Sequence, residues 1–148
     1  MLKKLPNFTS LIIFLSILLF NAINLNAQCD NNQRRDAYKQ LAGATYLRDF
    51  KISLPEKSGR KIPVEELSMI MNKGSRYRFV AQGDPTRPGN PVVIIYDNFQ
   101  EYVNAENGTQ TVIFEFECTK TQVYNIQVSF QNGKDGCCIL MLGLSSPK

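Results

Sequence analysis

Histidine, the commonest acid–base group of enzymes, is absent from the 148 residues of this chain. A Ser-His-Asp triad, a Cys-His pair and a zinc site with histidine ligands are therefore excluded. Two carboxylate pairs have the residue types for acid–base work, Glu65 with Glu66 and Glu115 with Glu117. Glu115 and Glu117 alternate with apolar residues, which is typical of the solvent-facing side of a strand. We therefore expect no enzymatic activity.

Oxygen ligands for a hard cation are concentrated after the apolar run 92–96, where Asp97, Asn98 and Glu101 follow closely. Calcium takes oxygen ligands from turns of this kind. The same residue types are also typical of an Asx turn that ends a strand, and this is the interpretation we prefer. The sequence thus predicts no cofactor, with a Ca²⁺ site at these three residues as the alternative.

A recognition surface is predicted in the loop of residues 82–91, QGDPTRPGNP, which contains three prolines and two glycines. Long loops held by a rigid scaffold often carry binding residues. The candidate binding residues are Asp84, Arg87 and Asn90, together with Tyr96 at the end of the next apolar run. A plain connection between two strands is the alternative.

The N-terminal residues have the order of a secretory signal peptide: Lys3 and Lys4, an apolar run over 11–20, and the small residue Ala27. The apolar run is shorter than the roughly 20 residues that span a membrane. We therefore expect residues 1–27 to be removed, and the protein to be secreted or periplasmic without stable membrane insertion.

A lipid anchor on Cys29 is not expected, because Gln28 stands where lipid attachment would require a small residue. Removal of the signal segment takes away two lysines and no acidic residue, so the net charge falls from +4 to +2. This near-neutral balance, without a basic run, argues against nucleic acid as a partner.

The chain after the signal segment is expected to form a single domain of β structure. Residues 28–44 are a polar lead-in with helix-like spacing, and alternating apolar and polar residues begin near Thr45. The segment 64–71 is ambiguous, and we interpret it as a strand that turns at 72–75 into a strand over 76–81. Seven or eight short strands without helix–strand alternation predict an antiparallel β-sandwich over 45–148. The other expected strands are 49–54, 92–96 (covered on both faces), 99–103 at an edge, 111–118, 123–130 and a buried 137–144.

Four segments together resemble the bacterial pre-peptidase C-terminal domain: NKGSRYRF at 72–79, IIYDN at 94–98, FEFECTKTQVYNIQV at 114–128, and a last strand led by Gly136-Cys137. The resemblance covers roughly Tyr46 to Leu144 and extends to small secreted bacterial proteins built on the same plan. It implies a jelly-roll-like β-sandwich that binds or stabilises rather than catalyses. Gln122 departs from the pattern, since the family usually has glycine there.

The four cysteines, Cys29, Cys118, Cys137 and Cys138, allow three complete disulfide pairings. Neighbours on a strand face opposite ways, so only one of Cys137 and Cys138 can point toward Cys118. The resemblance implies a Cys118–Cys137 bridge, which leaves Cys138 on the other face, where the lead-in could bring Cys29. The alternative is that all four thiols stay reduced.

Three function classes follow. The first is an exported, non-catalytic binding or accessory module, whose partner is a protein or glycan of the envelope or the medium. The second is a structural subunit of a cell-envelope or secretion assembly. The third is a histidine-free hydrolase that uses paired carboxylates.

Overall fold

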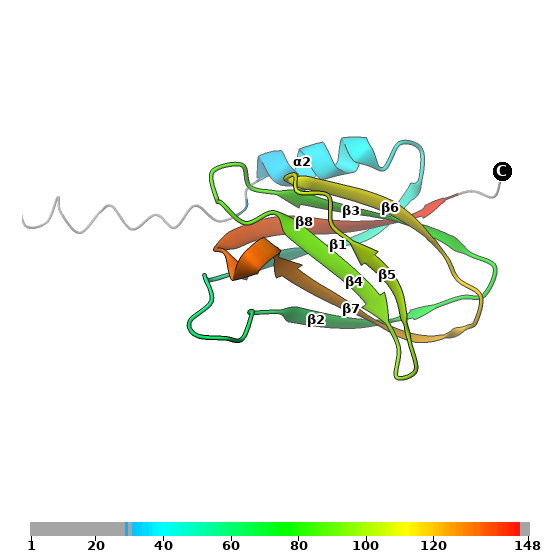
Figure 1. Cartoon of the computed structure of the whole chain (residues 1–148). Coiled ribbons are helices and arrows are strands. Elements are labelled where there is room, and N and C mark those ends of the chain that lie inside the picture. The colour runs from blue at the N-terminus through cyan, green and yellow to red at the C-terminus, as the bar shows by residue number, and fades with distance from the viewer. Residues whose placement is uncertain (1–28, 30, 146–148) are drawn as a thin grey trace, which may run out of the picture.

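The computed structural model describes Cys29 and residues 31–145, so the predicted signal peptide at 1–27 lies outside the described part of the chain. This part contains one α-helix, a short 3-10 turn and eight strands (Figure 1). The helix confirms the predicted helical lead-in. The bounds are α2 Asn31–Gln40, β1 Thr45–Leu54, β2 Glu65–Met71, β3 Arg76–Gly83, β4 Pro91–Tyr96, β5 Glu101–Ala105, β6 Thr111–Glu117, β7 Gln122–Phe130, η1 Gln131–Gly133 and β8 Gly136–Ser145.

The strands form two four-stranded sheets packed face to face. We call the sheet with strand order β1-β8-β3-β6 sheet I, and the sheet with order β2-β7-β4-β5 sheet II. Every paired strand runs antiparallel to its neighbour. The chain repeatedly crosses between the sheets, so that β8 returns between β1 and β3 while β7 returns between β2 and β4. This is the eight-strand jelly roll, which confirms the predicted fold class.

The core lies between the sheets and follows the predicted alternation. On β7, Tyr124, Ile126 and Val128 point inward and are almost fully buried. On β6, Phe116 is buried and Phe114 stacks on Phe79 of β3, with ring centroids 5.0 Å apart. Burial of each such side chain contributes about 2 kcal/mol. The inward faces expected for the strands at 49–54, 111–118 and 123–130 are thus confirmed.

The prediction that the strand at 92–96 is covered on both faces is wrong. Val93 and Ile95 of β4 are buried in the core, but Val92, Ile94 and Tyr96 on its other face are only half-buried. The reason is that no helix or strand of the described part lies over the outer face of sheet II (Figure 1).

The strand covered on both faces is β8, in agreement with its apolar run, because α2 packs across the outer face of β8 and β3 (Figure 1). The helix is polar and buries only Ala37, whose small side chain allows close approach, while Leu41 after its end is also buried. Gly143 of β8 makes the same approach possible, since a Cβ there would lie 3.0 Å from both Leu41 and Ala44. A second, smaller core therefore forms outside the sandwich.

A disulfide ties this second core together. Cys29, immediately before α2, is bonded to Cys137 at the start of β8, with the two Cα atoms 5.8 Å apart. Cys118 and Cys138 are free and buried. The Cys118–Cys137 pairing is therefore wrong, as is the alternative in which all four thiols stay reduced.

Strand direction and register explain this pairing. Cys137 points outward with Ile139 and Met141 toward α2, whereas Cys138 points into the main core. Cys118 bonds to Ser75 at the beginning of β3, while Cys138 lies opposite Gly83 at the other end of that strand. The eight residues of β3 separate the two positions by roughly 25 Å, which no disulfide can bridge.

We predict that non-reducing peptide mapping of the purified protein finds one linked pair of peptides, Cys29 with Cys137. Cys118 and Cys138 should resist alkylation in the native protein and react once it is unfolded. Burial raises the pKa of the Cys138 thiol to about 12, so little reactive thiolate is present at neutral pH. A link that involves Cys118 would contradict this pairing.

The bridge should also contribute strongly to stability. It closes a loop of 108 residues, and on the chain-entropy estimate a loop of about 100 residues gains about 4.7 kcal/mol. We expect the double variant Cys29→Ala/Cys137→Ala to lose between about 2 and 5 kcal/mol of unfolding free energy in a denaturant titration. Reducing agent should lower the stability of the wild type and leave that of the double variant unchanged.

Candidate functional site

The predicted binding residues of the 82–91 loop are held by bonds within the protein. Asp84 is only 3% exposed, and its carboxylate accepts hydrogen bonds from the Thr86 amide and hydroxyl, at 2.9 and 2.7 Å. Asn90 donates to the Gly108 carbonyl at 2.9 Å and to Gln131 at 3.2 Å. Asp84 thus shapes its own loop, and Asn90 holds neighbouring loops together.

Arg87 also holds separate segments of the chain together, and it does so through three contacts. Its guanidinium donates to the Ser53 hydroxyl at 3.0 Å and to the Gly136 carbonyl at 3.2 Å, and it pairs with Asp135 at 3.4 Å. It therefore connects the end of β1 with the start of β8. The involvement of Asp84, Arg87 and Asn90 in ligand binding stays a prediction, and their contacts assign them a structural role.

We predict that Arg87→Ala lowers the free energy of unfolding by about 2 kcal/mol, since hydrogen bonds from a charged group are worth about 1.5–3 kcal/mol. Arg35→Ala is the matched control, because within the described part of the chain this exposed arginine on α2 bonds only to the Asn32 side chain, one helical turn away. The control should change stability by less than about 0.5 kcal/mol. Equal stability of the two variants in urea would show that Arg87 does not connect the loops.

Tyr96 lies at the opposite end of β4 from this loop, on the outer face of sheet II. Its hydroxyl donates to Glu66 of β2 at 3.0 Å, and this hydrogen bond raises the pKa of Tyr96. The structure thus separates Tyr96 from Asp84, Arg87 and Asn90. It brings Tyr96 instead to the turn that contains Asp97, Asn98 and Glu101.

Asp97 organises this turn. One carboxylate oxygen accepts from the amides of Phe99 and Gln100, at 2.8 and 3.0 Å. The other accepts from the Tyr102 hydroxyl and the Gln122 side chain, both at 2.7 Å. These donors, with the Tyr102 hydroxyl the strongest, lower the pKa of Asp97 to about 2. The Asx turn expected here is present.

The four donors also bear on the alternative Ca²⁺ site. Both oxygens of Asp97 already accept two hydrogen bonds each, so a cation would have to displace N–H and O–H groups. In the part of the chain that the structure describes, no three acidic, cysteine or histidine side chains lie close enough to hold a metal ion. Calcium binding by Asp97, Asn98 and Glu101 therefore stays a prediction without structural support.

Gln122 has a specific role at the position where the resembled family usually has glycine. Its side chain donates to Asp97 and, at 3.3 Å, to the Tyr102 hydroxyl. Tyr102 in turn packs edge-on against Phe116 and Tyr124 of the core. A polar side chain at the start of β7 thus fixes the β4–β5 hairpin to the sandwich.

We predict that Asp97→Asn removes a pH-dependent part of the stability. A group with a lowered pKa in the folded state stabilises the fold above its ordinary pKa, here 3.8, and this contribution disappears as the pH falls through about 2. The difference in unfolding free energy between wild type and variant should be largest above about pH 5 and vanish between about pH 4 and pH 2. A difference that stays constant over this range in denaturant titrations would contradict the assignment.

The turn also bounds a shallow hollow of about 390 Å³ on the outer face of sheet II, which we call the hairpin hollow. Phe99 stands at its rim with 92% of its surface exposed. Phe99 is not among the binding residues predicted from the sequence, because an aromatic residue near a strand end is more often part of the core. Its position directly after Asp97-Asn98, within the turn itself, was the available signal. The hollow is lined by Ile94, Tyr96, Asp97, Asn98, Phe99, Gln100, Glu101 and Gln127.

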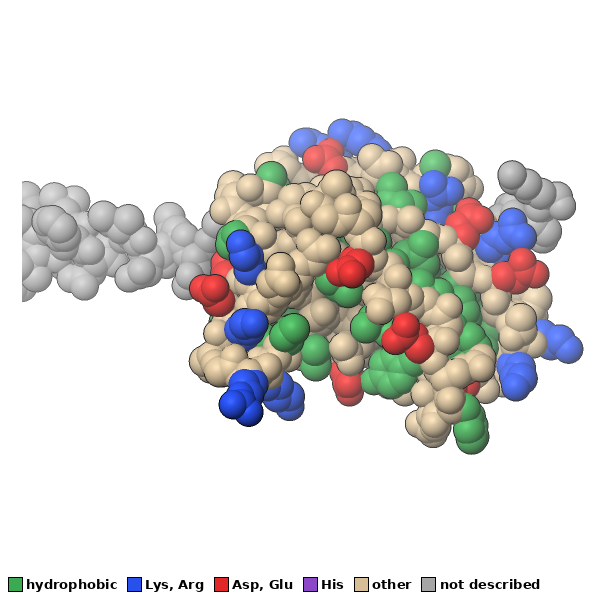
Figure 2. Space-filling view, viewed as in Figure 1, with side chains coloured by type: hydrophobic (Ala, Val, Ile, Leu, Met, Phe, Trp, Pro, Cys, Tyr) green, Lys and Arg blue, Asp and Glu red, His purple; other side chains and the backbone are tan. Residues whose placement is uncertain are grey.

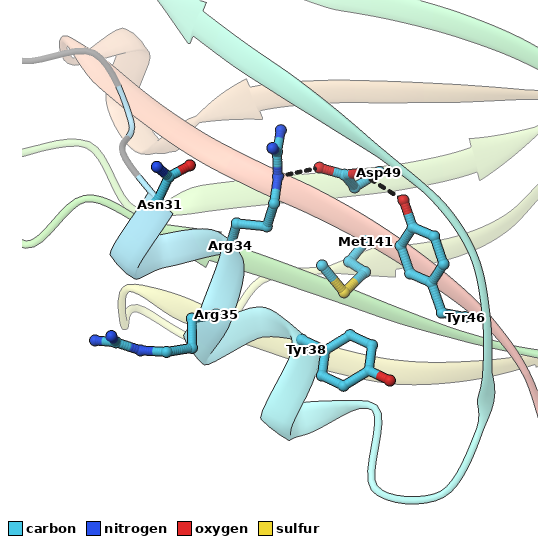
Figure 3. A pocket seen from close by; sticks show the side chains of 7 residues that line it. All are labelled: Asn31, Arg34, Arg35, Tyr38, Tyr46, Asp49 and Met141. Carbon is cyan, nitrogen blue, oxygen red and sulfur yellow. Dashed lines mark hydrogen bonds and ion pairs between the residues drawn. The ribbon is translucent and has the colours of Figure 1, made fainter.

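A second hollow of about 410 Å³, the α2 groove, lies between α2 and β1 with Met141 of β8 as its floor (Figure 3). Tyr38 and Tyr46 line it, with ring centroids 6.3 Å apart. Arg34 pairs with Asp49 at 2.7 Å, and the Tyr46 hydroxyl donates to the same carboxylate at 2.7 Å. Its polar groups are thus largely bonded to one another. None of these residues was predicted as a site.

The two outer faces differ in charge. No strand of sheet II contains a lysine or an arginine. Sheet I carries Arg48 and Lys51 on β1 and Arg76 and Arg78 on β3. In the view with β4, β5 and β7 in front, basic side chains gather at the rim, while hydrophobic and acidic ones occupy the middle (Figure 2). The strands that form the hairpin hollow therefore supply no cation.

No protein-family model matches this sequence, and no curated protein matches it either. Among solved structures, the chain is similar to the pre-peptidase C-terminal domain of a collagenase from Bacillus anthracis, with a TM-score of 0.51 and 12% sequence identity. The match covers 64% of this chain and 87% of that chain. At this identity the likeness concerns the fold, and it confirms the resemblance and the jelly-roll-like β-sandwich expected from the sequence.

Proposed function

We propose that this protein is an exported, non-catalytic binding module whose ligand surface is the outer face of sheet II around the hairpin hollow. The observation that supports this proposal most strongly is that one sheet is covered on its outer face and the other is not. Sheet I has its central strands covered by α2, whereas sheet II presents Phe99, Ile70 and Val123 to solvent, at 92%, 70% and 52% exposure. Lysine is depleted and aromatic residues are enriched at binding interfaces, which fits a face with exposed Phe99 and no lysine.

The arrangement of the carboxylates supports a non-catalytic role. Glu115 and Glu117 form ion pairs with Arg76 on the outer face of sheet I, at 3.9 and 3.0 Å. Glu66 accepts the hydrogen bond from Tyr96. The carboxylates of a hydrolase face each other across a cleft, and these belong to different surfaces. The fold likeness to a pre-peptidase C-terminal domain agrees with an accessory rather than an enzymatic role.

The cysteines support export. A disulfide such as Cys29–Cys137 persists in oxidising compartments and is rare in the cytosol. Its formation also engages the Cys29 sulfur, which a lipid anchor would need as its own attachment point. Within the described residues, the only α-helix is far too short and polar to cross a membrane. A secreted or periplasmic location without a lipid on Cys29 fits these features.

One observation favours the second class, a structural subunit of an envelope assembly. Ile70 lies at the edge strand β2 directly opposite Val123 of β7, and both are exposed. A pair of apolar side chains beside an unpaired strand edge is suited to contact with another chain. A fixed oligomer in light scattering, lost in Ile70→Ser, would favour this alternative.

The binding function is tested by cosedimentation of the mature protein with the envelope fraction of the organism that produces it. We expect the wild type to be retained and Phe99→Ala to lose at least tenfold in affinity, because Phe99 offers the most exposed apolar surface of the face. Tyr38→Ala is the matched control, an aromatic residue 61% exposed on α2, and it should bind as the wild type does. No retention, or equal retention of Phe99→Ala, would refute the proposed surface.

A further inference from the structure

We infer that the hairpin hollow binds an uncharged glycan chain. The inference rests on the proposed function and names the chemistry of its ligand. A pyranose ring presents a face of C–H groups and a rim of hydroxyls that both donate and accept hydrogen bonds. A matching site needs an accessible aromatic ring and neutral groups that donate and accept hydrogen bonds. It does not need charged groups.

The aromatic ring is supplied by Phe99, with Tyr96 in the same hollow. Phe99 is 92% exposed, so its ring can be covered by a ligand without any rearrangement of the protein. Covering such a ring with the C–H face of a sugar removes apolar surface from water on both partners. Ile94 extends the apolar part of the lining.

The neutral hydrogen-bonding groups are three side-chain amides, those of Asn98, Gln100 and Gln127. Each amide offers two N–H donors and one carbonyl acceptor, which suits a hydroxyl. Among the described residues, none of these three has a hydrogen-bond partner for its side chain. They are therefore available to a ligand.

The amides at the other end of the sandwich are different. Asn90 donates to the Gly108 carbonyl, Asn107 to the Thr111 carbonyl, and Gln110 to the Arg87 carbonyl. Those side chains hold loops together, as buried or half-buried amides commonly do. At the hairpin hollow, by contrast, three amides without a partner among the described residues line one and the same site.

The charges around the hollow favour an uncharged ligand over an acidic one. Glu101 lines it, and Glu66 lies beside it as the acceptor for Tyr96. None of the four strands of sheet II supplies a lysine or arginine to pair with a carboxylate or sulfate. An acidic polysaccharide would meet like charges without a counter-charge.

The hollow is also held in shape before any ligand arrives. The four hydrogen bonds to Asp97 fix the turn that carries Asn98, Phe99 and Gln100. A fixed turn loses little conformational entropy on binding. The α2 groove lacks this combination, because Arg34, Asp49 and Tyr46 already satisfy one another there.

The test treats the envelope fraction before the cosedimentation assay, in one arm with proteinase K and in another with periodate, which cleaves the vicinal diols of sugars. We expect retention of the wild type to survive proteinase K and to fall at least tenfold after periodate. Gln127→Ala should lose about tenfold in affinity, equivalent to about 1.4 kcal/mol, and Tyr38→Ala should stay within twofold of the wild type. Retention should be the same at low and high salt, because no charge pairing is involved.

The outcomes separate the two proposals. Retention that depends on Phe99 but disappears after proteinase K leaves the binding surface in place and overturns the glycan as ligand. Retention that survives both treatments overturns it as well, and loss of retention at high salt would identify a charged ligand instead. No retention before any treatment refutes the proposed function itself. Circular dichroism of each variant verifies that loss of binding is not loss of fold, which exposed positions such as Phe99 should tolerate.

Discussion

The apolar outer face of β8 is the constraint on which the arrangement of this domain depends. Ile139 and Met141 point away from the main core, yet both are only 1% exposed. A strand that is apolar on both faces must be covered on both, and a single sandwich core covers only one. The helix α2 supplies the second cover, and the Cys29–Cys137 bridge fixes the beginning of that helix to the strand it protects.

This cover makes the two sheets unequal. The polar outer surface of α2 and the arginines of β1 and β3 give sheet I a charged exterior. Sheet II needs no cover, because its outward residues are amides, hydroxyls, carboxylates and scattered apolar side chains. A face that stays open, and whose strands carry no lysine or arginine, is available for recognition, and this asymmetry underlies the function proposed here.

The two ends of the sandwich are held by different polar groups. At one end Arg87 connects three loop segments, and at the other Asp97 gathers four donors around the β4–β5 turn. Both groups serve the fold, and beside the second the amides of Asn98, Gln100 and Gln127 have no partner among the described residues. Likeness in fold to the collagenase domain at 12% identity therefore carries no information about the ligand, because ligand recognition depends on such side chains and not on the strand order.

The sequence alone determined the strands, the sandwich and the inward faces of the strands at 49–54, 111–118 and 123–130, because apolar and polar residues alternate there with the period of a strand. It also determined the absence of histidine chemistry and the turn at Asp97. It did not decide which cysteine pairs with Cys137. Cys137 and Cys138 face opposite ways, and only the register across β3 showed that Cys118 and Cys138 lie at opposite ends of that strand. Nor did it reveal that Phe99 is exposed, that Arg87 is bonded internally, or that Gln122 reaches Asp97. Each of these depends on contacts between residues far apart in the chain, and only the tertiary structure, by bringing the strand ends together, decides which polar groups are satisfied and which remain free.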